Sequence, residues 1–184
     1  METTVSLVQM LDARERRVQH QQALLAQYHK PLICFTMNIC GPVKDSPLIR
    51  RGFARGRQLL RQQFLRAKLV PLREDAIREV TGCEAFYVLD ADPLTIKKFT
   101  TDIEDATPLG LLFDMDVIRP DGRKVDREEL HLEGRRCLIC GGPAKVCSSR
   151  RVHTVAELQE KTTEILTDAR DAPVSYTHLR AHET

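Results

Sequence analysis

Residues 110–118 (GLLFDMDVI) constrain the fold of this chain most, because two aspartates interrupt a run that is otherwise apolar. Successive side chains of a strand point to opposite faces of the sheet, so this alternation predicts one buried face and one that carries both acids. The expected buried side chains are Leu111, Phe113, Met115 and Val117. The opposite face would hold Asp114 and Asp116, whose backbone positions in a strand lie about 6–7 Å apart.

Two carboxylates at this spacing can both reach one hard divalent cation. Mg²⁺ prefers oxygen ligands and leaves coordination sites for substrate phosphates. Without a cation the two negative charges would repel each other. The alternative is an edge strand whose solvent face carries two acids and no metal. We favour the metal site and predict that Asp114 and Asp116 are catalytic Mg²⁺ ligands.

The composition predicts one domain with its own core, since the chain has 184 residues and 42% hydrophobic content. We expect the domain to span 1–174, and residues 175–184 to be a non-native or disordered tail that continues no earlier periodicity. No apolar run is long enough for a membrane span, and the first residues lack the features of a secretory signal. These observations predict a cytoplasmic protein without a membrane partner.

The charges are distributed asymmetrically along the chain. Residues 46–73 contain eight basic residues and no acidic one, whereas residues 84–116 contain eight acids and two lysines. A basic segment followed by an acidic, metal-competent one suits a polyanionic substrate, with arginines on its phosphates and acids on the bridging cation. The alternative is a solvated helix face. Nucleic acid is not an expected partner, because the chain has no Trp and only 5% aromatic residues for base stacking.

The hydrophobic periodicity and the turn residues predict an α+β fold with a small mixed or antiparallel sheet packed by helices. We expect helices over 5–28, from 47 until Pro71, from 93 through 103 and from 155 through 166, and strands over 32–38, 84–89 and 110–118. The expected N-caps of the last three helices are Ser46, Asp92 and Thr154. The expected apolar face of the first helix comprises Val8, Leu11, Val18, Leu25 and Tyr28.

A cysteine cluster lies within residues 137–153. Cys137 and Cys140 have the two-residue gap with which a knuckle presents two sulfurs to zinc, and glycines follow directly. Cys147 and His153 could complete four Zn²⁺ ligands, although their gaps match no standard finger. The alternative is a set of reduced cysteines beside a surface histidine.

Three basic residues are candidates for phosphate contacts. Lys44 lies in a Gly-Pro loop directly after a predicted buried strand, where a rigid base supports a functional side chain. Arg135 and Arg136 precede the knuckle, and guanidinium groups match phosphate oxygens. The alternative for the two arginines is an exposed position without a role.

Three segments together resemble a known family: GLLFDMDV at 110–117, RRCLIC at 135–140 and TMNICGPVK at 36–44. The sequence is similar to the apo-citrate lyase phosphoribosyl-dephospho-CoA transferases, or holo-citrate lyase synthases, from about Leu11 to Thr167. Members of that family attach 2′-(5″-triphosphoribosyl)-3′-dephospho-CoA to a serine of the citrate lyase acyl carrier subunit and release pyrophosphate. Leu111 and Cys40 depart from the arginine and the proline expected there.

The resemblance implies a nucleotidyltransferase-like reaction in which the carrier serine attacks the phosphorus nearest the ribose. Asp114 and Asp116 would then hold Mg²⁺, while Lys44, Arg50 and Arg51 would bind the triphosphate of the donor. Two alternatives remain open from the residues alone. One is a zinc-knuckle interaction module, and the other is a nucleotidyltransferase for another carrier, such as that of malonate decarboxylase.

Overall fold

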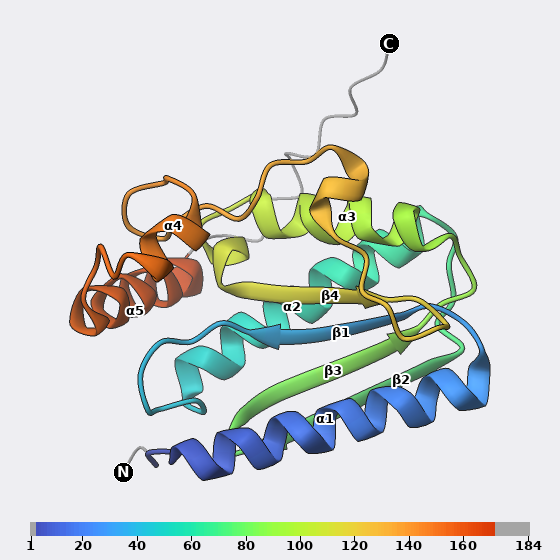
Figure 1. Cartoon of the computed structure of the whole chain (residues 1–184), viewed down its shortest axis with the longest axis horizontal. Helices are drawn as coiled ribbons and strands as arrows, with labels where there is room; N and C mark the ends of the chain where they lie inside the picture. The colour runs from blue at the N-terminus through green and yellow to red at the C-terminus, as the bar shows by residue number, and fades with distance from the viewer. Residues whose placement is uncertain (1–2, 172–184) are drawn as a thin grey trace.

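The computed structural model describes residues 3–171, which form one antiparallel sheet with helices on both faces (Figure 1). Its strands lie in the order β2-β3-β1-β4, so that the two central strands are β3 and β1. The strand bounds are Leu32–Met37 for β1, Arg73–Glu79 for β2, Gly82–Val88 for β3 and Phe113–Ile118 for β4. The expected α+β class and the antiparallel alternative for the sheet are confirmed.

Local sequence signals explain where most helices begin. The α-helices are α1 (Leu7–Tyr28), α2 (Pro47–Arg66), α3 (Pro93–Asp105), α4 (Ala144–Ser149) and α5 (Val155–Asp171), and the 3-10 helices are η1 (Leu109–Leu112) and η2 (Arg127–Leu130). The side chains of Ser46, Asp92 and Thr154 accept hydrogen bonds from backbone N–H groups three residues on, as predicted for N-caps. None of the helices within 3–171 is long and apolar enough to cross a lipid bilayer.

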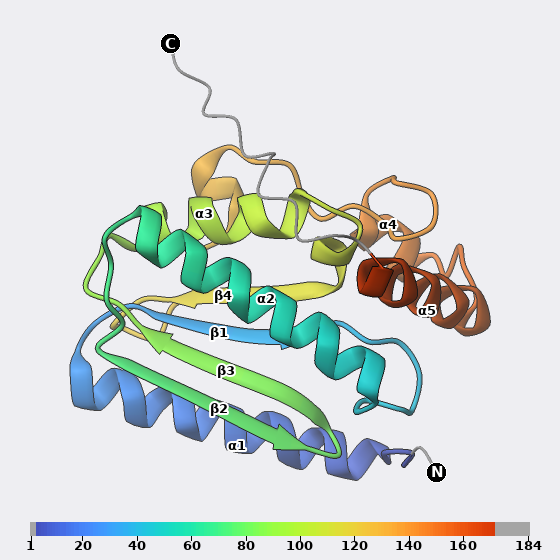
Figure 2. The same ribbon diagram turned by 180° about the vertical axis from the view of Figure 1, so that it is seen from behind.

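One face of the sheet, which we call the closed face, packs into the main core. α2 and α3 contact the sheet here, and α5 packs against α2 and η1 (Figure 2). The strands contribute seven side chains, each at most 1% exposed: Ile33, Phe35, Ala85, Tyr87, Phe113, Met115 and Val117. At Gly56 of α2, an added methyl group would collide with the ring of Phe35, so the glycine sets how closely α2 approaches β1.

The other face, which we call the α1 face, is covered by a single helix (Figure 1). Leu24 and Leu25 of α1 pack there against the apolar end of the sheet, which includes Leu32, Phe86 and Ile118. Towards the N-terminus of α1, the strands present polar side chains instead. The α1 face is therefore apolar and covered by α1 at one end and polar at the other.

The structure differs from the sequence-based expectations in three elements. Leu111 belongs to η1 and not to a strand, because Gly110 packs directly onto the last carbonyls of α3 and the strand begins only at Phe113. β2 was not predicted, since it is a charged edge strand (REDAIRE) that, within the part of the chain that the structure describes, pairs along one side only.

The apolar face expected for α1 is confirmed only at its C-terminal end, where Leu25 is buried and Tyr28 packs against the same cluster; it was wrong for the first turns. Val8, Leu11 and Val18 are 66%, 51% and 48% exposed, because this helix meets the strands with charged side chains along much of its length. The expected tail over 175–184, and the domain end at 174, lie outside the described residues.

Candidate active site and zinc knuckle

Asp114 and Asp116 lie on the same face of β4, as the alternation predicted. They stand opposite Thr36 and Cys34 of β1, on the α1 face of the sheet. Their side chains are 44% and 31% exposed, so both carboxylates are open to solvent. A ligand can therefore reach either acid.

Each of these aspartates has its own cationic partner. Arg135 Nη1 donates to Asp114 Oδ1 at 3.1 Å, and Lys124 Nζ donates to Asp116 Oδ2 at 2.5 Å. Arg135 also donates to the Phe113 carbonyl. The two ion pairs balance the local negative charge and leave the second oxygen of each carboxylate without an ion pair among residues 3–171.

Asp114 lines a small polar cavity of about 150 Å³ between α1 and the end of the sheet. Thr36 and Asn38 contribute polar groups to this cavity, and its cations come from Arg14, Arg17 and Lys44. Lys44 Nζ donates to the Ile39 carbonyl. Burial, together with the nearby charge of Arg14, lowers the pKa of Lys44. Three cations thus face the same small space as Asp114, a composition that suits an anionic ligand.

A larger cavity of about 630 Å³ lies between the start of β4, the cysteine cluster and α5. Its apolar lining includes Leu111, Leu138, Val155 and Leu158. Its cations come from Arg135, Arg136 and Arg151. Asn38 lines both cavities, and the Arg135–Asp114 ion pair joins a residue of the larger cavity to one of the smaller. The two cavities are therefore neighbours.

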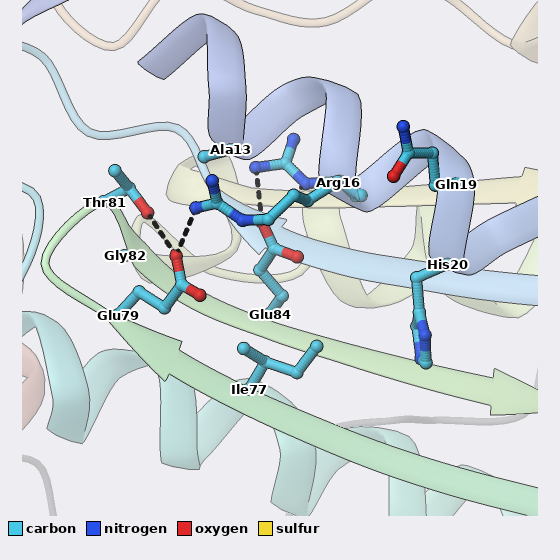
Figure 3. Close-up of a pocket in the computed structure, with 10 residues that line it drawn as sticks. Ala13, Arg16, Gln19, His20, Ile77, Glu79, Thr81, Gly82 and Glu84 are labelled. Atoms are coloured by element: carbon cyan, nitrogen blue, oxygen red, sulfur yellow. Dashed lines mark hydrogen bonds and ion pairs between the residues drawn. The ribbon is translucent and has the colours of Figure 1, made fainter. Parts of the chain in front are cut away.

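A third cavity, of about 340 Å³, separates α1 from the β2–β3 hairpin (Figure 3). Arg16 pairs with Glu79 at 2.5 Å across it, as Figure 3 shows. Arg17 pairs with Glu84 at 2.7 Å. Arg16 and Glu79 neutralise each other, and the pair with Glu84 fixes Arg17 at the edge of the Asp114 cavity. We therefore assign this cavity a structural role.

Not all of the predicted phosphate-binding residues converge on Asp114. Lys44 and Arg135 do, while Arg136 lines the larger cavity and is paired with Glu133. Arg50 is paired with Asp45 at 2.9 Å, and Arg51 is exposed on α2; neither lines the three cavities described above.

Sequence reasoning missed two arginines of the site, Arg14 and Arg17. Their three-residue spacing places them on one side of α1, but that spacing does not reveal which side meets the sheet. This was decided by the packing of the helix.

Glu104 of α3 was also missed, and it supports Arg135 from behind β4. Its side chain is 4% exposed, accepts a hydrogen bond from the Met115 N–H at 2.8 Å and pairs with Arg127 at 2.6 Å. Arg135 Nη2 lies 3.7 Å from its Oε1. Burial raises the pKa of Glu104 despite these partners. The sequence shows only a glutamate at the end of a predicted helix. That its side chain is buried becomes known only from the structure.

The four predicted zinc ligands lie together. The ligating atoms of Cys137, Cys140, Cys147 and His153 are all within 4.8 Å of one another. The six-residue and five-residue gaps are closed by a tight turn at Gly141, whose φ of 70° favours glycine, and by the short helix α4. Burial raises the pKa of Cys137, but hydrogen bonds from the backbone N–H groups of Cys140 and Ile139 and with the thiols of Cys140 and Cys147 together lower it, and the net pKa is lowered.

Comparison with known proteins identifies the family. Residues 5–169 match the family model CitX, described as apo-citrate lyase phosphoribosyl-dephospho-CoA transferase. The chain is 33% identical over 165 residues to the protein of that name from Citrobacter koseri, covering 90% of each chain. It is 32% identical over 164 residues to the protein of that name from Escherichia coli O1:K1, covering 89% of this chain and 90% of the relative. Protein CitXG of Haemophilus influenzae is 34% identical over 157 residues, which are 85% of this chain and 34% of that longer protein. The chain therefore belongs to the CitX family of apo-citrate lyase phosphoribosyl-dephospho-CoA transferases.

Proposed function

We propose that this chain transfers the phosphoribosyl-dephospho-CoA group from its triphosphate donor to a serine of the acyl carrier subunit of apo-citrate lyase, releasing pyrophosphate. Two relatives that match along nearly their whole length carry the name of this transferase. The alternatives, a zinc-knuckle interaction module and a transferase for another carrier, are not favoured by the family match.

The observation that carries the proposal is the position of Asp114 at the junction of two unlike cavities. The small cavity is polar and lined by three cations, and the large one is mostly apolar with arginines at its rim. The donor also consists of two unlike parts, because a compact, highly charged triphosphate is joined to a long dephospho-CoA moiety with an adenine ring. We assign the triphosphate to the small cavity and the dephospho-CoA moiety to the large one.

Lys44, Arg14 and Arg17 are then the groups that hold the triphosphate, with Arg135 at the boundary between the cavities. Guanidinium groups bind phosphate oxygens through paired N–H donors, whereas a lysine acts as a single charge. Arg50 and Arg51, at the start of α2, are less directly placed for this role. The reaction depends chiefly on positioning and charge neutralisation, both of which these side chains can supply.

The donor set at β4 fits Mg²⁺. Within residues 3–171, Asp114 and Asp116 each keep one oxygen that is not used in an ion pair, and Thr36 lines the same cavity as Asp114. Hard oxygen ligands of this kind are those that Mg²⁺ prefers. When bound, Mg²⁺ would supply charge neutralisation at the phosphates.

Mass spectrometry of the carrier tests the proposal. Apo-carrier of citrate lyase is incubated with donor, Mg²⁺ and this chain, and the expected result is a mass increase equal to one phosphoribosyl-dephospho-CoA group. The Citrobacter koseri relative serves as a positive control. Absence of a mass increase, in a reaction where that relative succeeds, refutes the proposal. An equal rate on the malonate decarboxylase carrier would refute the choice of acceptor while leaving the chemistry intact.

A further inference from the structure

The segment 131–154, which contains the cysteine cluster, has almost no core of its own. Cys137 is its one buried residue, while Ile139, Val146 and Val152 are 37%, 41% and 55% exposed. A segment that buries so little apolar surface needs another source of stability, and in small modules this source is commonly a disulfide or a metal ion.

The sulfur atoms of the cluster are spaced as ligands of one ion. The Sγ atoms of Cys140 and Cys147 are 3.5 Å apart. Tetrahedral zinc, with Zn–S distances of about 2.3 Å, places its sulfurs about 3.8 Å apart, whereas a disulfide requires about 2.05 Å. All six cysteines of the chain are free thiols. The spacing therefore fits shared coordination better than a covalent bond.

His153 provides independent support. Its Nε2 is buried and has no hydrogen-bond partner among residues 3–171. A buried polar atom without a partner costs on the order of 1–3 kcal/mol, so its position beside three thiols calls for an explanation. A metal ion bound through Nε2 would remove that cost, because a neutral imidazole nitrogen is a common zinc ligand.

The backbone around Cys137 has the form of a closed loop. The Cys137 N–H donates to the Gly142 carbonyl at 2.7 Å, and the Gly141 N–H donates to the Cys137 carbonyl at 3.1 Å. These hydrogen bonds fold the loop so that Cys137 and Cys140 lie on the same side of it as Cys147. The ligands are thus preorganised by the main chain.

We propose that Cys137, Cys140, Cys147 and His153 bind one structural Zn²⁺ ion that holds residues 131–154 in place and so positions Arg135 against Asp114. Three thiolates and one imidazole are soft and borderline ligands, which select Zn²⁺ over Mg²⁺. Four protein ligands complete a tetrahedral shell and leave no open position for chemistry. On binding, each thiol releases its proton to the solvent.

The connection to the active site runs through the main chain of Arg135. Its carbonyl accepts a hydrogen bond from the Ala144 N–H at 2.8 Å, which ties it to the far side of the loop. Arg136 forms a β-bridge with Pro143 directly next to it. The side chain of Arg135 then reaches Asp114. Arg135 is therefore a positioning residue, because the position of its side chain depends on the fold of residues 131–154.

Metal analysis of the purified full chain tests the site without relying on activity. We expect about one zinc per chain, a thiolate-to-metal absorption band after replacement by Co²⁺, and at least a tenfold loss of bound zinc in Cys140→Ser and Cys147→Ser. Cys83→Ser is the matched control, because Cys83 is a half-buried thiol on β3 and lies outside the cluster. It should keep its zinc.

Three results would overturn the metal site. The first is wild-type chain, refolded with Zn²⁺, that holds less than a tenth of an equivalent. The second is a Cys140–Cys147 disulfide found in chain purified under mild conditions. The third is an equal loss of zinc in Cys83→Ser. The Co²⁺ titration uses wild-type chain only, so it remains decisive if the serine variants fail to fold.

Hydrogen exchange tests the positioning role. Removal of the metal with a chelator should speed exchange over 134–154 at least tenfold and leave β1 and β3 unchanged. Arg135→Ala should keep one equivalent of zinc, because it removes only the side chain that the loop presents. Unchanged exchange over 134–154 after metal removal would contradict the structural role. Neither readout depends on the transfer reaction, so a failure of the proposed function would be recognised separately.

Discussion

The two faces of the sheet differ in character: one packs into the main core, and the other carries the residues of the proposed active site. The closed face packs seven strand side chains, each at most 1% exposed, into the main core below α2 and α3. The α1 face is most apolar at the end that Leu24 and Leu25 contact, and beyond that end it carries Asp114, Asp116 and Glu84.

The difference arises because one helix cannot cover a whole sheet face. α1 buries only Ala13, Leu24 and Leu25, and much of its remaining contact with the strands is made by polar and charged side chains, including two arginine–glutamate ion pairs. Antiparallel sheets tolerate this arrangement, since one of their faces can remain in contact with solvent. The proposed active site occupies the part of the sheet that no apolar helix face covers.

The largest expected effect is the loss of transfer in Asp114→Asn. We expect kcat/KM to fall about 1000-fold, about 4 kcal/mol in activation free energy, because this residue lines the small cavity, pairs with Arg135 of the large one and loses its charge. Asp116→Asn should have a smaller effect, since Asp116 lies two residues further along β4 and does not line the small cavity. Steady-state kinetics with purified carrier measures both. Wild-type rates in Asp114→Asn would show that the α1 face does not carry the reaction through this residue.

Substitutions in the closed face should change the free energy of unfolding rather than the rate of transfer. Leu60 of α2 is fully buried there, and Leu60→Ala should lower the free energy of unfolding by about 3 kcal/mol. Leu65 lies on the same helix but is 79% exposed, so Leu65→Ala should change stability by less than about 0.5 kcal/mol. Urea unfolding gives both values. Equal costs for the two variants would show that the closed face is not the core.

The cations of the small cavity offer a finer test. Lys44→Ala should raise the KM for the donor about tenfold, about 1.4 kcal/mol, with a smaller effect on the KM for the carrier. Lys98 on α3 is the control, because it is exposed and paired with Asp102; Lys98→Ala should match the wild type. A Lys44→Ala defect limited to the carrier would assign this lysine to docking.

The smallest expected effect is a pH dependence of stability from Glu104. Because burial raises its pKa, the folded chain keeps this proton at pH values where the unfolded chain has lost it. The contribution of Glu104 is therefore complete below the unfolded value of 4.5 and is lost as the pH rises through the folded pKa. Unfolding of wild type and Glu104→Gln across this range should show wild type losing stability relative to the variant. Parallel curves would contradict the shift.

Much of the fold could be predicted from the sequence, because its signals are local. A capping residue followed by a proline marks the start of α2 and of α3 whatever surrounds the helix. The alternation at Asp114 and Asp116 determines their common face in the same way, since it depends only on the pleat of the strand. The edge strand β2 escaped prediction, because a strand with one partner and charged faces has no apolar pattern to reveal it.

The sequence by itself determined which acids share a strand face and which cysteines could share an ion, since short spacing decides both. Only the tertiary structure decided which cations meet those acids. Arg14 and Arg17 reach the site from α1, whereas Arg50 turns to Asp45. The physical reason is that a charge interacts with what lies within a few ångströms of it. For side chains far apart in the chain, packing of the helices against the sheet sets that distance.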